Sequence, residues 1–299
     1  MTLALPLRGA PRPVQAADLL ALTKPRITQL VVMTTAAGFV LASPDGVAFG
    51  RLAHALAGTA LVAGGTNALN QWWERGSDAL MPRTRARPLP AGRLDPRVAL
   101  GFGWGIALAG IGYLAGATNP LTALLAAATL LSYVFAYTPL KRRSPAALGV
   151  GAVPGALPIV GGWTAAGGAL DAGAAALFLI LFLWQLPHFL ALGWLYRGDY
   201  RRAGLRLAGV ADDTGAGTAR RAALGTVALV IASLVPVGLG PKTAILSFGG
   251  VLALGAWLTA RAVGFARAPT DEAARRLFFA SVVYLPALLG LLVADHIAR

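Results

Sequence analysis

Long apolar runs divide this sequence and restrict the folds that the chain can adopt. Nine stretches of roughly twenty residues contain few charged side chains, and polar breaks separate them. A helix of this length spans the hydrocarbon core of a bilayer, where backbone groups must satisfy one another. The sequence therefore predicts an all-α polytopic membrane protein, with spans at 27–43, 52–73, 97–117, 119–137, 146–166, 171–195, 222–240, 243–264 and 276–296.

Composition agrees with a membrane bundle and with a single domain. Only 13% of the 299 residues are charged and the mean hydropathy is +0.66, whereas about a quarter of the residues are charged in soluble domains. Abundant Ala and Gly favour close packing of helices in lipid. Because no long linker interrupts the chain, we expect one membrane domain over 22–299. The stretch 1–21 is predicted to be an amphipathic cytoplasmic lead-in, because it lacks the continuous apolar core of a signal peptide.

The net charge of +14 raises the alternative of a nucleic-acid-binding protein, so the positions of the basic residues decide the matter. With a cytoplasmic N-terminus, all but three of the 26 Lys and Arg residues fall in cytoplasmic segments, the exceptions being Arg51, Lys242 and Arg299. This is the positive-inside pattern of an odd number of spans, with the C-terminus on the opposite side. Topology thus accounts for the charge, and we expect the bilayer rather than nucleic acid as a partner. The absence of Cys excludes disulfides and thiolate metal sites.

A polar cluster, NALNQWWERGSD, follows the second predicted span directly. On a continuing helix Asn67, Asn70, Glu74 and Asp78 fall within about 80° of arc, so four oxygen-bearing side chains share one face. Mg²⁺ accepts such ligands and is commonly held by one or two carboxylates together with substrate phosphates. The alternative is a solvated helix end, but membrane proteins seldom leave polar clusters at a span terminus without use.

Several arginines follow this cluster in a segment that Pro and Gly stiffen, MPRTRARPLPAG. Guanidinium groups bind phosphate in a bidentate manner, so Arg83 and Arg87, spaced i,i+4 beside the acids, are predicted to bind a diphosphate. Arg93 and Arg97 are better explained as positive-inside anchors at the membrane surface.

The pattern NxxxExxxD followed by MxRTxxRPLPAG resembles the first polar motif of the intramembrane prenyltransferases, which move a polyprenyl group onto an aromatic acceptor. The resemblance implies nine helices around a central cavity that is open toward the cytoplasm. It also implies Mg²⁺ as the cofactor, with Asn70, Glu74 and Asp78 as ligands. The family more often has Asp where this chain has Glu74, whose side chain reaches one methylene further.

Two further segments resemble basic motifs of the same family. LTKPRI places Lys24 at the start of the first span, and AYTPLKRRSP places Tyr137, Lys141 and Arg142 at the end of the fourth. The resemblance implies that Lys141 and Arg142 bind the leaving diphosphate. Lys24 either reaches the diphosphate or serves topology, and Tyr137 either bonds the diphosphate or belongs to the interfacial aromatic belt.

The segment WQLPHF, followed by YRGDY, resembles the haem-farnesylating branch of the family, whereas other branches carry a second acid-rich motif here. His188 and Tyr196 are therefore predicted to contact haem, and Asp199 to complete the metal site. On one continuous helix His188 and Asp199 would lie on nearly the same face, about 16 Å apart along the axis.

An imidazole inside a span is costly to leave unused, so His188 is a functional candidate. Three roles remain open: ligation of the porphyrin iron, acceptance of a proton, or a hydrogen bond between helices. The other two histidines, His54 and His296, are predicted to be interfacial. Asp212 and Asp213 lie in a turn, where helix capping explains them.

The resemblance implies transfer of the farnesyl group of farnesyl diphosphate to a vinyl group of protohaem IX, with addition of water, to form haem O for terminal oxidases. Haem B is then a substrate rather than a cofactor. The expected location is the cytoplasmic (inner) membrane of a prokaryote, with the active site toward the cytoplasm. A downstream haem-modifying enzyme or oxidase assembly factors are candidate partners. Two alternatives remain, namely a prenyltransferase for a quinone precursor or chlorophyll-type acceptor, and a multi-span transporter of anionic solutes.

Overall fold

The computed structural model describes residues 13–210, 212–239 and 245–298, and every regular element within these ranges is helical. The predictions concerning the first twelve residues, Lys242 and Arg299 lie outside the described residues. The helices are α1 (Ala16–Leu22), α2 (Pro25–Leu41), α3 (Phe49–Asp78), α4 (Pro96–Ala117), α5 (Pro120–Leu131), the π-helix η1 (Ser132–Tyr137), α6 (Thr138–Leu140), α7 (Ala147–Ala165), α8 (Ala172–Leu195), α9 (Arg197–Arg202), α10 (Ala216–Leu239), α11 (Ile245–Arg267) and α12 (Asp271–Ile297).

The predicted spans correspond closely to the long helices. Seven segments are long and apolar enough to cross a membrane: α4, the continuous run α5–η1–α6, α7, α8, and most of α10, α11 and α12. The first predicted span is α2, with 17 residues, and the second is α3, with 30 residues and the polar cluster in its last turns. The all-α membrane fold is confirmed, whereas the count of nine spans and the sides on which the termini lie stay predictions.

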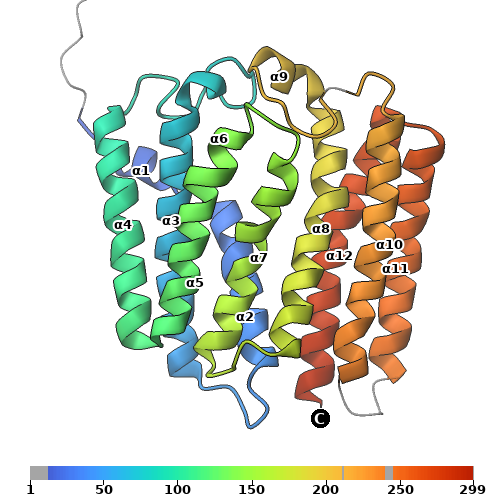
Figure 1. The fold of residues 1–299 in the computed structure, drawn as a ribbon. Helices are drawn as coiled ribbons and strands as arrows, with labels where there is room; N and C mark the ends of the chain where they lie inside the picture. The colour runs from blue at the N-terminus through green and yellow to red at the C-terminus, as the bar shows by residue number, and fades with distance from the viewer. Residues whose placement is uncertain (1–12, 211, 240–244, 299) are drawn as a thin grey trace, which may run out of the picture.

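The long helices stand side by side, with α2 behind α7 in the middle of the bundle (Figure 1). Glycines permit the closest contact between these two helices. A Cβ added at Gly38 of α2 would lie 2.0 Å from the carbonyl oxygen of Ile159, and one added at Gly162 of α7 would lie 1.9 Å from that of Thr35. The backbones therefore meet directly, as small residues allow in lipid.

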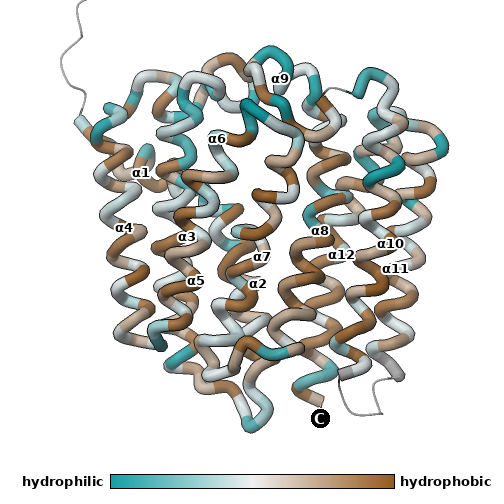
Figure 2. Tube along the Cα trace, in the orientation of Figure 1, coloured by the Kyte–Doolittle hydropathy of each residue, from teal (hydrophilic) through white to brown (hydrophobic). Residues whose placement is uncertain are grey.

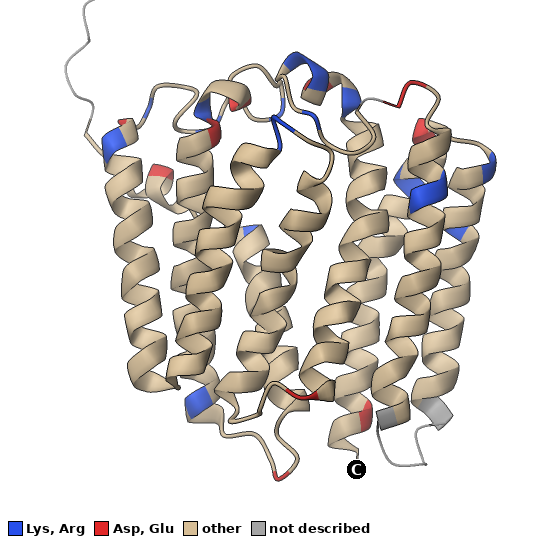
Figure 3. Ribbon diagram, in the orientation of Figure 1, with Lys and Arg blue, Asp and Glu red and all other residues tan. Residues whose placement is uncertain are grey.

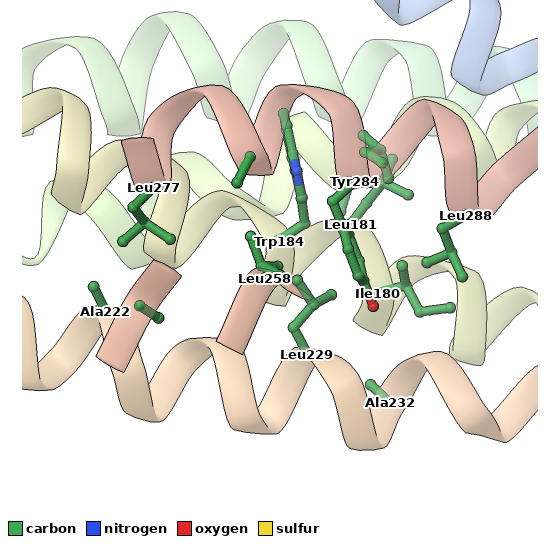
Figure 4. Close-up of a cluster of buried hydrophobic side chains, with 14 of the residues drawn as sticks. Ile180, Leu181, Trp184, Ala222, Leu229, Ala232, Leu258, Leu277, Tyr284 and Leu288 are labelled. Atoms are coloured by element: carbon green, nitrogen blue, oxygen red, sulfur yellow. The ribbon is translucent and has the colours of Figure 1, made fainter. Parts of the chain in front are cut away.

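Hydrophobic residues predominate along the lengths of the helices, while hydrophilic residues gather at the two ends (Figure 2). The largest buried cluster joins α8, α10, α11 and α12, with Leu181, Leu229, Leu258 and Leu288 among its members (Figure 4). Many other large apolar side chains face outward along the same helices. This outward apolar surface suits lipid rather than water.

Lys and Arg residues concentrate at the end of the bundle where α9 lies, and few are found at the opposite end (Figure 3). The loops at the α9 end include the arginine segment that follows α3 and the Lys141 segment that follows α6. This distribution agrees with the positive-inside pattern and brings the predicted phosphate-binding residues to one end of the molecule.

Candidate active site

A polar pocket of about 200 Å³ lies where α3 ends. Asn70, Glu74 and Asp78 all line it, as expected for residues four apart on one helix face. The helix continues through these residues and ends at Asp78, so these three side chains share the face toward the pocket, whereas Asn67, predicted for the same face, does not line it. Both Asn70 and Asp78 are 1% exposed, which means that their oxygens are held away from bulk water.

Each of these three oxygen-bearing side chains contacts a basic side chain, which comes from a distant part of the chain for Asn70 and Glu74 and from nine positions further along for Asp78. Lys24 Nζ donates to Asn70 Oδ1 at 2.7 Å, and Lys141 Nζ donates to Glu74 Oε1 at 2.8 Å. The Arg87 guanidinium donates to Asp78 Oδ2, also at 2.7 Å. Three of the predicted metal ligands and three of the predicted diphosphate-binding cations therefore contact one another in one pocket.

Lys24 reaches the pocket because the junction between α1 and α2 is bent around it. Its φ of 48° is the single positive value among the described residues other than Gly, and Pro25 begins α2 directly after it. Gln71 of α3 donates to the Ala21 and Leu22 carbonyls, which fixes this junction against α3. A residue held in this sparsely populated conformation is typical of a functional position.

The π-helix η1 positions the aromatic wall of the pocket. Tyr133 and Tyr137 both belong to this π-helix, with their rings 5.0 Å apart, and both line the pocket. The Lys141 ammonium lies 4.3 Å from the centre of the Tyr137 ring, a cation–π contact. Gly151 makes room for that ring, since an added Cβ would lie 2.5 Å from its Cδ2 atom. Single π turns often occur at functional sites.

Charges around the pocket alter the pKa values of its titratable groups. Burial alone would raise the pKa of Glu74, but Lys141 and Lys24 outweigh it and lower that pKa below the ordinary value. Burial alone would lower the pKa of Lys141, yet the Glu74 carboxylate raises it well above the ordinary value. Burial, and then the repulsion of Arg87, lower the pKa of Lys24 to about 7. Glu74 and Lys141 are therefore a charged pair, while Lys24 titrates near neutral pH.

An apolar cavity of about 400 Å³ adjoins the polar pocket between α2, α3, α5, α7, α8 and α12. The cavity and the pocket are continuous, because they share the lining residues Ile27, Tyr133, Tyr137, Gly151, Phe189 and Leu192. Asn67 lines the cavity rather than the pocket, and its amide donates to Thr23 O and Thr28 Oγ1. The predicted cavity is thus present, and its polar end is the charged pocket.

His188 of α8 also lines the apolar cavity, away from the charged groups. Its ring stacks on Trp184 with a centroid separation of 4.7 Å and lies 4.8 Å from Phe278 of α12. Its Nδ1 atom lies 2.9 Å from Ser281 Oγ. The hydrogen bond between helices that the sequence left open is therefore present.

Three predicted site residues line neither the polar pocket nor the apolar cavity. Asp199 forms an ion pair with Arg202 on α9, Arg142 is exposed, and Tyr196 packs under the Arg83 guanidinium at 5.0 Å. The expectation that His188 and Asp199 share a face of one helix is wrong. The chain leaves helical geometry at Tyr196, where α8 ends, and α9 starts in a new direction.

Other pocket residues were missed by the sequence reasoning. Tyr133, Met81 and Tyr200 line the polar pocket, and Ser281 supports His188 from α12. A spacing of four residues from Tyr137 was the available signal for Tyr133. Ser281 gave no signal, because it lies 93 positions from its partner in an ordinary apolar span.

The donor set fits a Mg²⁺ ion bound together with a diphosphate. Two carboxylates and one amide oxygen supply hard ligands, and Mg²⁺ usually completes its shell with substrate phosphates and water. No group of three or more His, Cys, Asp or Glu side chains able to hold an ion occurs in the described part of the chain. Asn70, Glu74 and Asp78 would hold the ion.

A charged, anion-binding pocket joined to an apolar cavity, within a bundle of membrane-length helices, defines an intramembrane enzyme that acts on a lipid-like diphosphate. The chain belongs to the UbiA prenyltransferase family, whose model matches residues 31–283. It is therefore a transferase, and the resemblance of its motifs to the intramembrane prenyltransferases is confirmed.

Relatives named protoheme IX farnesyltransferase match nearly the whole chain. The protein of Solibacter usitatus is 44% identical over 288 residues, which cover 93% of this chain and 98% of that protein. That of an Anaeromyxobacter species is 47% identical over 286 residues, 94% of each. The Myxococcus xanthus protein is 44% identical over 303 residues, 98% of this chain and 99% of that protein.

Solved structures share the fold at low sequence identity. A digeranylgeranylglyceryl phosphate synthase matches with a TM-score of 0.79 and 16% identity, over 95% of this chain and 99% of that one. A UbiA homologue from Archaeoglobus fulgidus bound to DMAPP and Mg²⁺ matches with a TM-score of 0.63 and 14% identity, over 92% of this chain and 99% of that one. At these identities the likeness describes the fold.

Proposed function

We propose that this protein transfers the farnesyl group of farnesyl diphosphate to a vinyl group of protohaem IX, with addition of water, to form haem O. One observation carries the proposal: a pocket with alternating acids and bases opens into an apolar cavity that holds an imidazole. The shared name of the relatives, at 44–47% identity over nearly the full length, supports haem as the acceptor.

The diphosphate would lie in the polar pocket, and the prenyl chain would extend into the cavity. Lys24, Arg87 and Lys141 are placed to donate to phosphoryl oxygens, with Arg83 at the rim. When bound, Mg²⁺ supplies Lewis-acid stabilisation of the negative charge that develops as the carbon–oxygen bond breaks. Asn70, Glu74 and Asp78 would hold the ion between the carboxylates and the diphosphate.

The apolar cavity protects the allylic cation that remains after the diphosphate leaves. Its walls are mostly aliphatic and aromatic, so water is scarce beside the reacting carbon until the vinyl group attacks. Tyr133 and Tyr137 stand at the junction of the pocket and the cavity, where this carbon would lie. Their ring faces stabilise positive charge there.

The concentration of basic residues at the α9 end supports a cytoplasmic position for the pocket, in the cytoplasmic membrane of a prokaryote, with the C-terminus on the other side. Haem O would then be released within this cytoplasmic membrane. A haem-modifying enzyme or an oxidase assembly factor would receive it there.

The test supplies the purified protein in lipid nanodiscs with protohaem, farnesyl diphosphate and Mg²⁺, and product masses are measured. We expect haem O, which should disappear when EDTA removes the metal. Asp78→Asn should lower the rate on the order of 100-fold, the usual loss when one electrostatic contact to a transition state is removed. Asp95→Asn is the matched control, because Asp95 caps α4 in the same segment and Asn caps equally well.

Parallel reactions with a hydroxybenzoate acceptor separate the alternatives. Prenylated benzoate without haem O would identify an enzyme of quinone synthesis. Mg²⁺-independent uptake of diphosphate into proteoliposomes, with no adduct, would identify a transporter. An Asp78→Asn rate equal to that of Asp95→Asn at limiting Mg²⁺ would refute the metal assignment.

A further inference from the structure

A serine on α12 contacts the cavity histidine. Ser281 is completely buried, and its Oγ atom lies 2.9 Å from His188 Nδ1. The same Oγ atom lies 2.6 Å from the carbonyl oxygen of Phe278, one turn earlier on α12. The hydroxyl therefore has two polar partners and a single hydrogen to donate.

These two contacts determine which imidazole nitrogen carries the proton. A carbonyl oxygen only accepts, so Ser281 must donate its hydrogen to Phe278. The contact with His188 is then satisfied only if Nδ1 carries a hydrogen and donates it to Ser281 Oγ. In the neutral ring this leaves Nε2 without a hydrogen and with a free lone pair.

Aromatic groups hold the ring in this orientation. Trp184 stacks on the imidazole at an interplanar angle of 24°, and Phe278 packs against it at 34°. The Trp184 indole reaches from α8 toward α12, where its Nε1 donates to the Ser281 carbonyl at 2.6 Å (Figure 4). Rotation of the imidazole would break the Ser281 contact and disturb this stack.

The Nε2 atom faces the cavity without a hydrogen-bond partner in the described part of the chain. His188 is half-buried, and it lines the 400 Å³ cavity. Its Nδ1 partner is a neutral hydroxyl, whereas histidines that act as bases are commonly supported by a carboxylate that stabilises the imidazolium. A neutral ring whose other nitrogen donates to an oxygen is the usual arrangement of a metal-ligating histidine.

We propose that Ser281 is a positioning residue that fixes the Nδ1-protonated form of His188, so that Nε2 coordinates the iron of the haem substrate in the cavity. This inference rests on the proposed function for the identity of the substrate. It assigns His188 Nε2 as the atom that binds the haem, and Ser281 as the residue that orients this atom. The dative bond would fix the porphyrin relative to the prenyl chain.

Haem binding to the purified protein in nanodiscs tests this assignment without farnesyl diphosphate. We expect the ferrous haem complex to show an iron–histidine stretching vibration in its resonance Raman spectrum. His188→Ala should abolish this band, and added imidazole should restore axial ligation. Ser281→Ala should retain the band at lower frequency and weaken haem binding roughly tenfold, the usual effect of losing the outer partner of a metal-bound histidine.

Two serine variants control for packing. Ser281→Thr keeps the hydroxyl and should behave as the unmodified protein does. Ser233→Ala removes a similar network elsewhere, since Ser233 bonds the Leu229 carbonyl and accepts from Tyr284 at 2.9 Å, and it should leave the band unchanged. Iron-free protoporphyrin IX should bind all variants equally, because it has no iron for His188 to coordinate.

The outcomes separate the two proposals. An unchanged spectrum in His188→Ala, or Ser281→Ala behaving as Ser233→Ala does, would overturn the inference even where haem O is formed. An iron–histidine band in a protein that prenylates only a different acceptor would overturn the proposed function and leave the coordination intact. Failure of haem to bind at all would overturn both.

Discussion

The buried ion pair between Arg87 and Asp78 is expected to support the fold as well as the site. Its atoms are 2.7 Å apart, and the side chains are 26% and 2% exposed respectively. Arg87→Met removes the charge while keeping a side chain of similar length. The Asp78 carboxylate would then be left in the bundle without its charged partner.

The loss of stability expected for Arg87→Met follows from the burial of the Asp78 carboxylate. Two unit charges about 4 Å apart attract each other by about 4 kcal/mol at an effective dielectric constant near 20, and part of this gain offsets the desolvation of the pair. Breaking a buried pair by removing one partner costs about 3–5 kcal/mol, so we expect Arg87→Met to lower the free energy of unfolding by about 3 kcal/mol. Asp78→Asn should cost only about 1 kcal/mol, because Arg87 keeps access to water.

The double variant distinguishes a structural from a binding role. Arg87→Met with Asp78→Asn should be only about 1 kcal/mol less stable than the unmodified protein, because no unpaired carboxylate remains. Prenyl transfer in the double variant should stay at or below the rate of Asp78→Asn, since both diphosphate and metal contacts are lost. Recovery of stability without recovery of activity is the expected result.

Reversible unfolding in mixed micelles, followed by tryptophan fluorescence, measures these free energies. Arg85→Met is the matched control, because Arg85 lies exposed in the same segment, and we expect a change within about 0.5 kcal/mol. A loss below 1 kcal/mol for Arg87→Met, or a double variant as unstable as the single one, would contradict the reasoning.

Three further predictions concern other contacts. Gly151→Ala should displace the Tyr137 ring, 2.5 Å from the new Cβ, and lower the transfer rate at least about tenfold in product assays, a usual effect of misplacing a reacting centre. Because the pKa of Lys24 is lowered to about 7 and a bound diphosphate raises it again, binding of inorganic pyrophosphate at pH 8 should take up close to one proton more in the unmodified protein than in Lys24→Met, and at pH 5.5 the two proteins should take up almost the same number. Calorimetry in two buffers measures the proton uptake of each protein, and equal uptake by both at pH 8 would refute the assignment. Gly38→Ala should cost about 1–3 kcal/mol in the unfolding assay, because its Cβ would meet the Ile159 carbonyl oxygen at 2.0 Å; an unchanged stability would mean that the two backbones are not in contact.

The long helices were predictable because span length and polar breaks fix both of their ends. The predicted span 97–117 corresponds to Pro96–Ala117, and 171–195 corresponds to Ala172–Leu195. The change of direction at Tyr196 was not predictable, since YRGDY carries no Pro and its residues are all compatible with a helix. The π turn η1 was equally hidden, because an extra residue in a helix leaves no mark in hydropathy.

The site was predictable where the spacing along one helix determines it. Asn70, Glu74 and Asp78 share a face because of the 3.6-residue period, whatever the rest of the fold. Their cationic partners are set by packing instead: Lys141 lies 67 positions from Glu74, and no local pattern relates the two. Periodicity thus identified the oxygen ligands, while their ion pairs required the three-dimensional structure.

The pairing explains how a prenyltransferase site keeps buried charges in a membrane. An unpaired carboxylate in this pocket would cost several kcal/mol, and each acid avoids this cost by contacting a base that the substrate also needs. The bases exceed the acids, so the pocket as a whole favours an anion. A metal ion alone would add to this positive excess, whereas a metal ion together with a diphosphate would reduce it. The joint entry of both ligands therefore follows from the charges that line the pocket: Lys24, Arg83, Arg87 and Lys141 against Glu74 and Asp78.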